Sequence, residues 1–447
     1  MNDVRKAQDL RRIPMKKNRI LALALTGILA VTAAAPMGVF AESEDHDPVS
    51  LRFMWWGGDE RNEATVKVID MFQEKYPWIT IEPEFSGSDG YQEKLSTALA
   101  GGQAADIIQN GPGWMPEFVS KGDFFIDFND YADQIDLTTF DADYLANVST
   151  YDGKLLGLPS GVAVQTLLVN TKLADEIGLE FTDDLTWDDL LEMGQKVQEY
   201  NSDMYLLNID SDLLNTHVFR PYYMQLSGKP FIDDETKAMS GDEDTLKTVL
   251  NYVDSLYTTK TVQPAGDSAT FKGSTQTNPK WINGEFVAAF TNSSQIDIFT
   301  AANPDAEYKV VALPHATDEK DDGWYANPPQ IMNVNKNSEH IDEAVMFLDY
   351  FFNDPEAAEV LGAVRSVPAS SAAREVCEEK GLISDLVNDA VNYGLSQNGT
   401  NEMGLTTDSE VAAAISTMLE SVIYGESTVD EAAANAESQL EFVLSEK

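Results

Sequence analysis

Two adjacent tryptophans, Trp55 and Trp56, stand directly before Gly57-Gly58 and the charged residues Asp59 and Arg61. Apolar side chains at every second position before them predict a strand, and the glycines allow the chain to turn tightly. Open α/β sheets bind ligands at the carboxyl ends of their strands. Exposed indole rings beside a few polar groups suit a sugar, whose C–H faces stack on aromatic surfaces. The alternatives are that both indoles are core residues, and that Asp59 and Arg61 cap or salt-bridge their own helix.

A second group of candidate residues follows another predicted strand. Residues 106–109 form a short apolar run that ends at Gln109 and Asn110, and Trp114 comes four residues later. These side chains are expected at the carboxyl end of a buried strand, as Trp56 is.

No arrangement of residues in the sequence is typical of a catalytic centre. The four histidines lack metal-binding spacing, and neither a Gly-x-Ser-x-Gly turn nor a phosphate-binding Gly-x-x-x-x-Gly-Lys loop occurs. Cys377, the only cysteine, falls in a charged helical segment and is expected to be a bystander. Fragments of calcium loops at 210–212 and 127–129 lack the glycine and the final glutamate. We therefore expect no catalytic residue, no metal and no cofactor.

The composition excludes several classes of partner. The formal net charge is -45, and residues 1–41 contain seven Lys or Arg and two Asp, so residues 42–447 carry -50. Such an acidic surface repels nucleic acid and anionic membranes and favours neutral or cationic partners. At 447 residues the chain is too long for one compact core, so two lobes are expected.

Residues 1–41 have the pattern of a secretory signal. Lys16, Lys17 and Arg19 precede the apolar run 20–31, and small residues at 39–41 suit cleavage before Glu42. The start of translation is open between Met1 and Met15. No cysteine follows the signal, so lipid attachment at that point is not expected.

The first hundred residues after the signal alternate strand and helix patterns. The run 51–56 predicts a strand, and apolar residues every four positions over 64–76 predict a helix. A second strand (79–85), a second helix (91–99) and a third strand (106–109) follow. This order predicts an α/β fold with a doubly wound, mostly parallel sheet.

Later segments have helix caps and further strands. Thr186 and Thr428 each begin a capping box, with Asp189 and Glu431 three residues on. The apolar positions of 246–256 predict an amphipathic helix, and 162–169, 286–290 and 310–313 read as strands. The last third of the chain lacks strand patterns.

The order of these segments resembles the extracellular solute-binding proteins of ATP-driven sugar importers, the maltose-binding-protein-like family. The matching stretches are 51–85, 91–109 (YQEKLSTALAGGQAADIIQ), 151–178, 186–195, 281–290 and 333–368, the last containing FLDYFFNDPEAA. The resemblance implies a two-lobe periplasmic-binding-protein-like fold with a three-segment hinge. Its crossings are expected near 159–169, 289–293 and 325–331. Lobe I would comprise 42–160 and 294–326, and lobe II 161–293 and 327–447.

The same resemblance extends the set of candidate ligand-binding residues. Arg365 lies in the segment LGAVRSVP, which resembles a family position at the cleft rim. The full set, carried over by motif, is Trp55, Trp56, Asp59, Arg61, Gln109, Asn110, Trp114, Asn292, Trp324, Tyr325, Gln330 and Arg365.

The implied function is that of a non-catalytic carbohydrate-binding protein. It would capture an oligosaccharide in a cleft between the lobes by hinge closure and deliver it to the membrane permease of an ABC importer. We expect an exported monomer at the extracellular face of the cell membrane or in the periplasm, with no nucleic-acid partner. A secreted carbohydrate-active enzyme and a sugar sensor that presents its bound state to a receptor are the alternatives.

Overall fold

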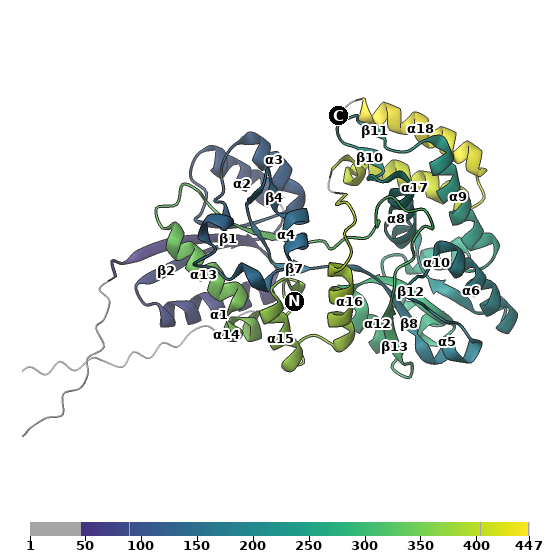
Figure 1. The fold of residues 1–447 in the computed structure, drawn as a ribbon, viewed down its shortest axis with the longest axis horizontal. Helices are drawn as coiled ribbons and strands as arrows, with labels where there is room; N and C mark the ends of the chain where they lie inside the picture. The colour runs from purple at the N-terminus through teal and green to yellow at the C-terminus, as the bar shows by residue number, and fades with distance from the viewer. Residues whose placement is uncertain (1–45, 89, 403, 446) are drawn as a thin grey trace, which may run out of the picture. The chain divides into compact units, whose positions relative to one another are not determined.

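A computed structural model describes residues 46–88, 90–402, 404–445 and 447. The predicted signal at 1–41 lies outside the described residues. Residues 47–447 form one compact unit built around two sheets with helices packed on them (Figure 1). The predicted α/β class is confirmed.

The first sheet has the strand order β2-β1-β3-β14-β6. β1 runs parallel to both β2 and β3, whereas β14 runs antiparallel to β3 and β6. Its parallel part comes from the alternating strands and helices predicted at the start of the chain, and β14 is added from a distant segment. The strands are β1 (Val49–Trp56), β2 (Ile79–Ser86), β3 (Ile107–Asn110), β6 (Leu158–Pro159) and β14 (Ile331–Val334).

Helices from the first part of the described chain and from 341–379 cover the first sheet. α1 begins at Asp59, directly after Gly58, and buries Val68 and Phe72 as its four-residue spacing predicts. α14 packs against α1 although some 280 residues separate them (Figure 1). The helices around this sheet are α1 (Asp59–Lys75), α2 (Tyr91–Ala100), α3 (Met115–Lys121), α4 (Ala142–Val148), α13 (Ile341–Asn353), α14 (Pro355–Leu361) and α15 (Ser371–Glu379).

The second sheet has the strand order β13-β8-β12-β9. β12 runs parallel to β9 and antiparallel to β8, and β13 runs antiparallel to β8. Strand directions in this sheet are therefore mixed. The strands are β8 (Gln165–Asn170), β9 (Tyr205–Asn208), β12 (Phe286–Asn292) and β13 (Tyr308–Val311).

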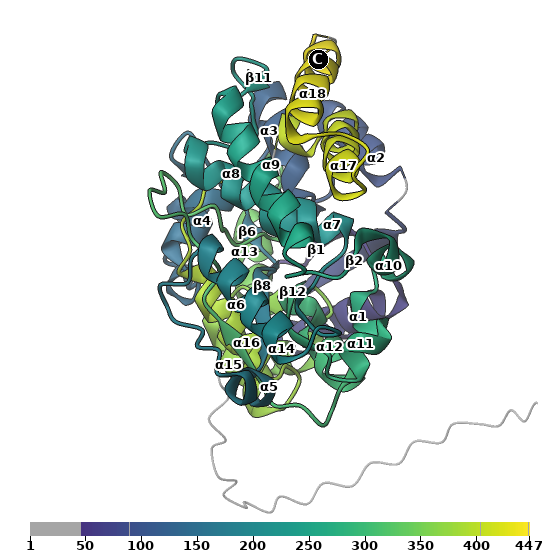
Figure 2. The ribbon, with the colours of Figure 1, turned by 90° about the vertical axis from the view of Figure 1, so that its right-hand side faces the viewer.

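The helices of the second sheet include both predicted capping boxes. Thr186 and Thr428 each accept a hydrogen bond from the backbone N–H three residues on, and the acidic side chain there accepts one in return. α17 and α18 pack together and against α9 (Figure 2). The helices are α5 (Thr171–Ile177), α6 (Trp187–Tyr200), α7 (Ser211–Leu214), α8 (Arg220–Ser227), α9 (Glu243–Thr258), α10 (Ala265–Ser268), α11 (Pro279–Ile282), α12 (Ile296–Ala302), α16 (Asp385–Leu395), α17 (Ser409–Ile423) and α18 (Val429–Leu444).

Three passages of chain connect the two sheets. The first follows β6 and reaches β8 through β7 (Gly161–Val162), and the second runs from β13 to β14. The third leads from α14 through β15 (Val367–Pro368), which pairs with β7, to α16. The crossing expected at 289–293 is wrong, because β12 continues into α12 and then into β13 of the same sheet.

The predicted division into lobes needs the same correction. The segment 294–326, assigned to lobe I, contains β13, which pairs with β8 in the second sheet. The segment 327–447, assigned to lobe II, contains β14, which pairs with β3 in the first sheet. Strand pairing with residues about 140 positions earlier for β13, and more than 220 positions earlier for β14, decides both assignments, and no local pattern specifies it.

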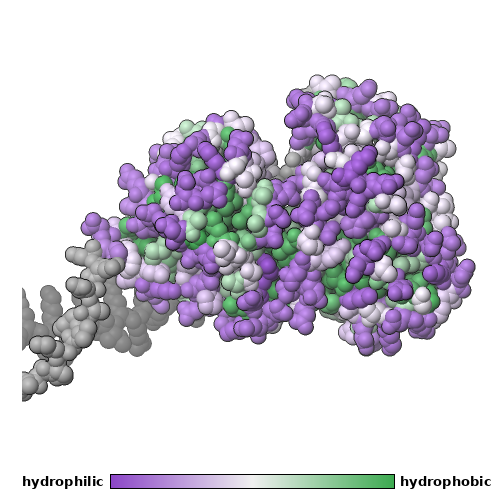
Figure 3. All heavy atoms as spheres, viewed as in Figure 1, coloured by the Kyte–Doolittle hydropathy of each residue, from purple (hydrophilic) through white to green (hydrophobic). Residues whose placement is uncertain are grey.

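Buried apolar side chains form three clusters on the sheet faces. One cluster contains side chains of the first sheet, of α1 and of α13. It continues to α16 and to Phe286 and Ala289 of β12. A second fills the other face of the second sheet under α6, α9, α17 and α18, and a third lies beneath α2 and α3. Hydrophilic side chains cover most of the face shown in Figure 3, as the acidic composition predicts.

Candidate functional site

The two adjacent tryptophans at the end of β1 have different environments, because successive side chains of a strand point to opposite faces. Trp55 is 0% exposed and packs against Phe53 in the core of the first sheet. Its indole Nε1 donates a hydrogen bond to Asn62 Oδ1 at 2.8 Å. The expectation that Trp55 offers a ligand-facing ring is therefore wrong for this structure, and the core alternative holds.

Trp56 forms a half-buried aromatic group with Trp114. Their ring centroids lie 5.1 Å apart, and Trp56 also lies 5.0 Å from Tyr91. Trp114 belongs to the short 3-10 turn Pro112–Trp114 that follows β3. Gly111 makes room for it, since a Cβ there would lie 2.6 Å from the Trp114 ring. Two neighbouring strand ends thus combine their indoles, as the sequence predicts.

The polar groups of this strand end face inward and hold the aromatic residues in place. Gln109 is buried, and its amide Nε2 donates to the Trp56 carbonyl at 3.0 Å. The Nδ2 of buried Asn110 donates to Met115 Sδ at 3.1 Å. Gln109 therefore positions Trp56, and neither amide lies on the surface in this structure.

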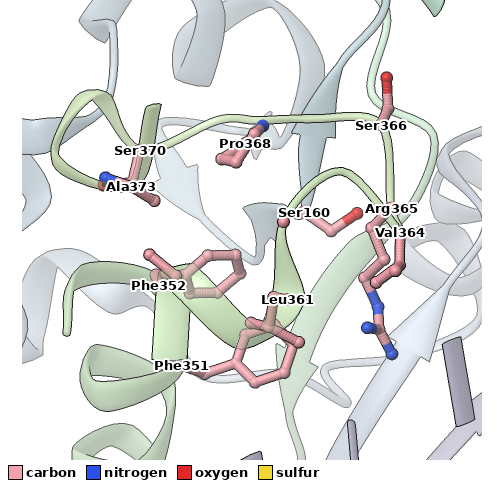
Figure 4. Close-up of a pocket in the computed structure, with 12 residues that line it drawn as sticks. Ser160, Phe351, Phe352, Leu361, Val364, Arg365, Ser366, Pro368, Ser370 and Ala373 are labelled. Carbon is pink, nitrogen blue, oxygen red and sulfur yellow. Dashed lines mark hydrogen bonds between the residues drawn. The ribbon is translucent and has the colours of Figure 1, made fainter. Parts of the chain in front are cut away.

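Arg365 is buried against Gln109 and α1. Its Nε donates to Gln109 Oε1 at 3.3 Å and its Nη2 to Thr65 Oγ1 at 2.8 Å, while the guanidinium lies 5.3 Å from the centre of the Phe351 ring. Burial, and secondarily the charge of Arg61, lowers the pKa of Arg365 to about 9. It borders a small, partly open pocket of about 30 Å³, enough for one water molecule (Figure 4).

An open pocket of about 630 Å³ lies where β1 passes into α1. Arg61 donates from Nε to the Val364 carbonyl and from Nη1 to the Trp56 carbonyl, at 3.1 and 3.3 Å. Burial lowers the pKa of Arg61. Asp59 is exposed in the first turn of α1, where a carboxylate interacts favourably with the helix dipole. The pocket is lined by Trp56, Gly57, Gly58, Asp59, Glu60, Arg61, Gly87, Ser88 and Val364.

The candidates expected near the second and third crossings lie apart from this group. Trp324 is 1% exposed, stacks on Trp187 and donates from Nε1 to the Pro314 carbonyl at 3.0 Å. It is a core residue of the second sheet, so its expected ligand-facing role is also wrong for this structure. Gln330 is buried and accepts from Ser160 Oγ at 2.9 Å, which ties two of the connecting passages together.

Asn292 and Tyr325 belong to the second sheet and the passage that leaves it. Asn292 is the half-buried last residue of β12. Tyr325 is buried, and its hydroxyl donates to Glu402 Oε2 at 3.3 Å. Burial raises the pKa of Tyr325, and the carboxyl of Glu402 adds to the shift. Tyr325 thus contacts an ionic group that the sequence did not indicate.

That ionic group consists of Arg220 and Glu402, with His217 beside it. Arg220 Nη2 lies 3.1 Å from Glu402 Oε2. His217 Nε2 lies 3.0 Å from the Thr291 carbonyl near the end of β12, and burial lowers the pKa of His217 to about 4. Residues 215–219 form a π-helical turn between α7 and α8, a rare geometry that often occurs at functional sites. Nothing in the sequence signals this turn or brings the loop residue Glu402 to it.

Comparisons with known proteins agree with this architecture. The sequence profile of the family described as "Bacterial extracellular solute-binding protein" matches residues 58–358, about two thirds of the chain. The chain belongs to the bacterial extracellular solute-binding protein family. It therefore belongs to a group of substrate-binding proteins and not to a family defined by catalysis.

Solved structures of other extracellular solute-binding proteins resemble this one over almost their whole length. A periplasmic oligogalacturonide binding protein from Yersinia enterocolitica is 27% identical in its complex with saturated digalacturonic acid, with a TM-score of 0.66 over 89% of this chain and 99% of that chain. A periplasmic solute-binding protein from Pectobacterium atrosepticum is also 27% identical, with a TM-score of 0.70 over 89% and 99%. A family 1 solute-binding protein from Alicyclobacillus acidocaldarius shares the fold, with 22% identity and a TM-score of 0.80 over 90% and 100%.

Curated relatives are more distant. A putative binding protein from Brucella abortus is 25% identical over 284 residues, 63% of this chain, and the chain spans 66% of that relative's length.

Within the residues that the structure describes, no helix of this solute-binding protein is long and apolar enough to cross a membrane. The same described residues contain no group of three His, Cys, Asp or Glu side chains suited to a metal ion.

Proposed function

We propose that this solute-binding protein binds an oligosaccharide and delivers it to the membrane permease of an ATP-driven importer. The observation that carries the proposal is the pair of half-buried indoles, Trp56 and Trp114, beside the open pocket that Asp59 and Arg61 line. Ligand sites of this kind combine apolar or aromatic surface with a few polar groups that fix orientation.

The chemistry of a sugar matches both parts of this site. The C–H face of a pyranose ring is apolar and stacks on an indole, and its hydroxyl groups exchange hydrogen bonds with side chains at the ring edge. Hydrogen bonds to charged groups such as Asp59 and Arg61 are stronger than those between neutral groups. A ligand of this class would therefore gain stacking area from Trp56 and directional bonds from the start of α1.

The extent of the aromatic surface supports a ligand longer than one ring. Trp56 and Trp114 meet at an interplanar angle of 44°, so a single flat ring cannot lie flush on both indoles. Two linked sugar units could each use one indole. The Yersinia relative, whose structure holds a digalacturonic acid, supports an oligomeric carbohydrate as the ligand class.

The transport role is proposed from the family and from the sequence pattern at 1–41. That pattern supports export to the outer face of the cell membrane or the periplasm, as a monomer. The three passages between the sheets supply a hinge, and ligand binding would shift the population toward a closed form that the permease recognises. In this role no bond of the sugar is made or broken, and neither a metal nor a cofactor takes part.

Calorimetry against a panel of di- to hexasaccharides tests the proposal. We expect saturable binding of at least one series, with affinity that rises with length and then levels off. The same mixtures are then chromatographed, and intact sugars are expected after prolonged incubation. A well-folded sample that binds no saccharide would contradict the proposal, and cleavage products would favour a secreted enzyme instead.

A further inference from the structure

The carboxyl end of β12 carries a second set of polar groups, away from the indoles of the first sheet. The π-helical turn at 215–219 lies against this strand end, because His217 Nε2 contacts the Thr291 carbonyl at 3.0 Å. Arg220 follows the turn directly as the first residue of α8. Open α/β sheets place ligands at such strand ends.

Glu402 reaches this place from the loop between α16 and α17. Its Oε2 lies 3.1 Å from Arg220 Nη2 and accepts the Tyr325 hydroxyl at 3.3 Å. The Glu402 side chain is 3% exposed, whereas that of Arg220 is 13% exposed. Three distant segments of the chain therefore meet at one buried carboxylate.

This ion pair keeps hydrogen-bonding capacity unused within the described residues. Arg220 Nε, Glu402 Oε1 and Asn215 Oδ1 are buried and have no partner among the side chains or backbone that the structure describes. A buried donor or acceptor without a partner lowers the stability of the fold, so such groups usually have a partner. Arg220 therefore has a donor, and Glu402 and Asn215 each have an acceptor, that no described group satisfies.

We propose that Arg220 and Glu402 are specificity-determining residues that recognise the hydroxyl groups of an uncharged sugar. This inference rests on the proposed function and names the class of carbohydrate. Adjacent hydroxyls of a sugar can accept from Arg220 Nε and donate to Glu402 Oε1 at once. In this role the indoles of the first sheet supply stacking, and the ion pair of the second sheet supplies hydroxyl recognition.

The charges of the ion pair and of the whole chain favour an uncharged ligand over an anionic one. The carboxylate of Glu402 neutralises Arg220, so the pair attracts no anion overall, and a ligand carboxylate next to Glu402 Oε1 would be repelled. The net charge of -50 on residues 42–447 opposes the approach of an anionic ligand as well. An uncharged oligosaccharide meets neither penalty.

The test compares matched neutral and anionic ligands. Binding of neutral malto-, xylo- and manno-oligosaccharides and of oligogalacturonides of the same length is measured by calorimetry for the wild-type chain and for Glu402→Gln. We expect the wild type to prefer a neutral series by at least about tenfold. We expect Glu402→Gln to reduce that preference about tenfold, because it removes the negative charge while keeping the shape and one acceptor.

Glu285→Gln is the matched control, because it is the same substitution and changes the net charge equally. Glu285 directly precedes the amino end of β12, opposite the strand end discussed here, and its Oε2 lies 2.6 Å from Lys280 Nζ, so its substitution should leave the preference unchanged. Arg220→Lys is the second variant. This variant keeps the positive charge but lacks Nε, so its affinity for neutral oligosaccharides should fall about tenfold. Thermal unfolding without sugar is measured to confirm that the variant is folded.

The outcomes separate the two proposals. A folded wild-type chain that binds no saccharide contradicts the proposed function. Sugar binding with the same neutral-to-anionic preference in the wild type, Glu402→Gln and Glu285→Gln overturns this inference alone. A wild-type preference for oligogalacturonides also overturns it.

Discussion

At the carboxyl end of β1 the chain exposes indole rings, whereas at the carboxyl end of β12 it gathers an imidazole, a guanidinium and a carboxylate. Trp56 and Trp114 provide aromatic surface for stacking. Few hydrogen-bonding groups are free beside them, because the amides of Gln109 and Asn110 face inward. Arg220 and Glu402 provide polar atoms but little apolar surface. The difference teaches that stacking and hydroxyl recognition can be supplied by separate sheets of one ligand-binding protein.

The largest effect is expected from the two fully buried tryptophans, one in the core beside each region. Trp55→Ala and Trp324→Ala should each lower the free energy of unfolding by about 3–5 kcal/mol, because each leaves a cavity in a packed core. Urea titration of each variant measures the loss. Trp56→Ala, one residue from Trp55, is the control, and a loss as large as that of Trp55→Ala would show that Trp56 is a core residue too.

The next effect concerns the buried imidazole beside the ionic group. The pKa of His217 is about 4 in the folded chain against 6.5 for a free histidine, because burial disfavours the cation. The unfolded chain therefore binds more protons between these pH values, and folding stability falls as pH drops from 6.5 toward 4. Between pH 7 and pH 4.5, His217 should account for a loss of about 2–3 kcal/mol.

His217→Gln should remove that part of the pH dependence while keeping a donor for the Thr291 carbonyl. Unfolding free energies at pH 7 and pH 4.5 are compared for the wild type, His217→Gln and His340→Gln, which lies at a more exposed position. Equal pH dependence in all three proteins would mean that His217 is charged in the fold.

Removing a ring from the aromatic pair sharpens the proposed role of the first sheet. Trp56→Ala or Trp114→Ala should weaken oligosaccharide binding about 10- to 100-fold, which corresponds to about 1–3 kcal/mol for losing one stacking surface. Trp114→Ala should affect long ligands more than disaccharides. Calorimetry over a series of lengths measures this, and an equal loss at every length would argue against two linked sugar units on two rings.

The smallest expected effect comes from moving a ring without removing it. Gly111→Ala places a methyl group 2.6 Å from the Trp114 ring and must displace it. Binding should weaken roughly fivefold, about 1 kcal/mol. Gly113→Ala is the matched control, because no atom lies within 4 Å of a Cβ at that position. Unchanged affinity in Gly111→Ala would mean that the ring position does not matter for binding.

Local patterns predicted the first sheet and the caps well. The alternation before Trp55, the four-residue spacing of α1 and the capping boxes at Thr186 and Thr428 are all interactions between residues close in sequence. The family profile and the two-sheet fold agree with the resemblance drawn from these patterns.

The sequence could not decide features that depend on distant partners. Alternation places Trp55 and Trp56 on opposite faces, but only the packing of Phe347 and Phe351 from α13 beside Phe53 determines which face is buried. The division of lobes failed because β13 and β14 join strands made much earlier. The ligand-binding roles of Trp56, Asp59, Arg61, Gln109, Asn110, Trp114, Asn292, Tyr325, Gln330 and Arg365 stay predictions.

The position of β14 has a consequence for how the chain reaches this fold. β14 lies between β3 and β6, yet it is synthesised after every strand of the second sheet. Until residue 334 has emerged, β6 has no neighbour in its sheet and β3 has an open edge. Contacts of such long sequence separation slow folding. The first sheet of the nascent protein thus stays incomplete until about three quarters of the chain has been synthesised.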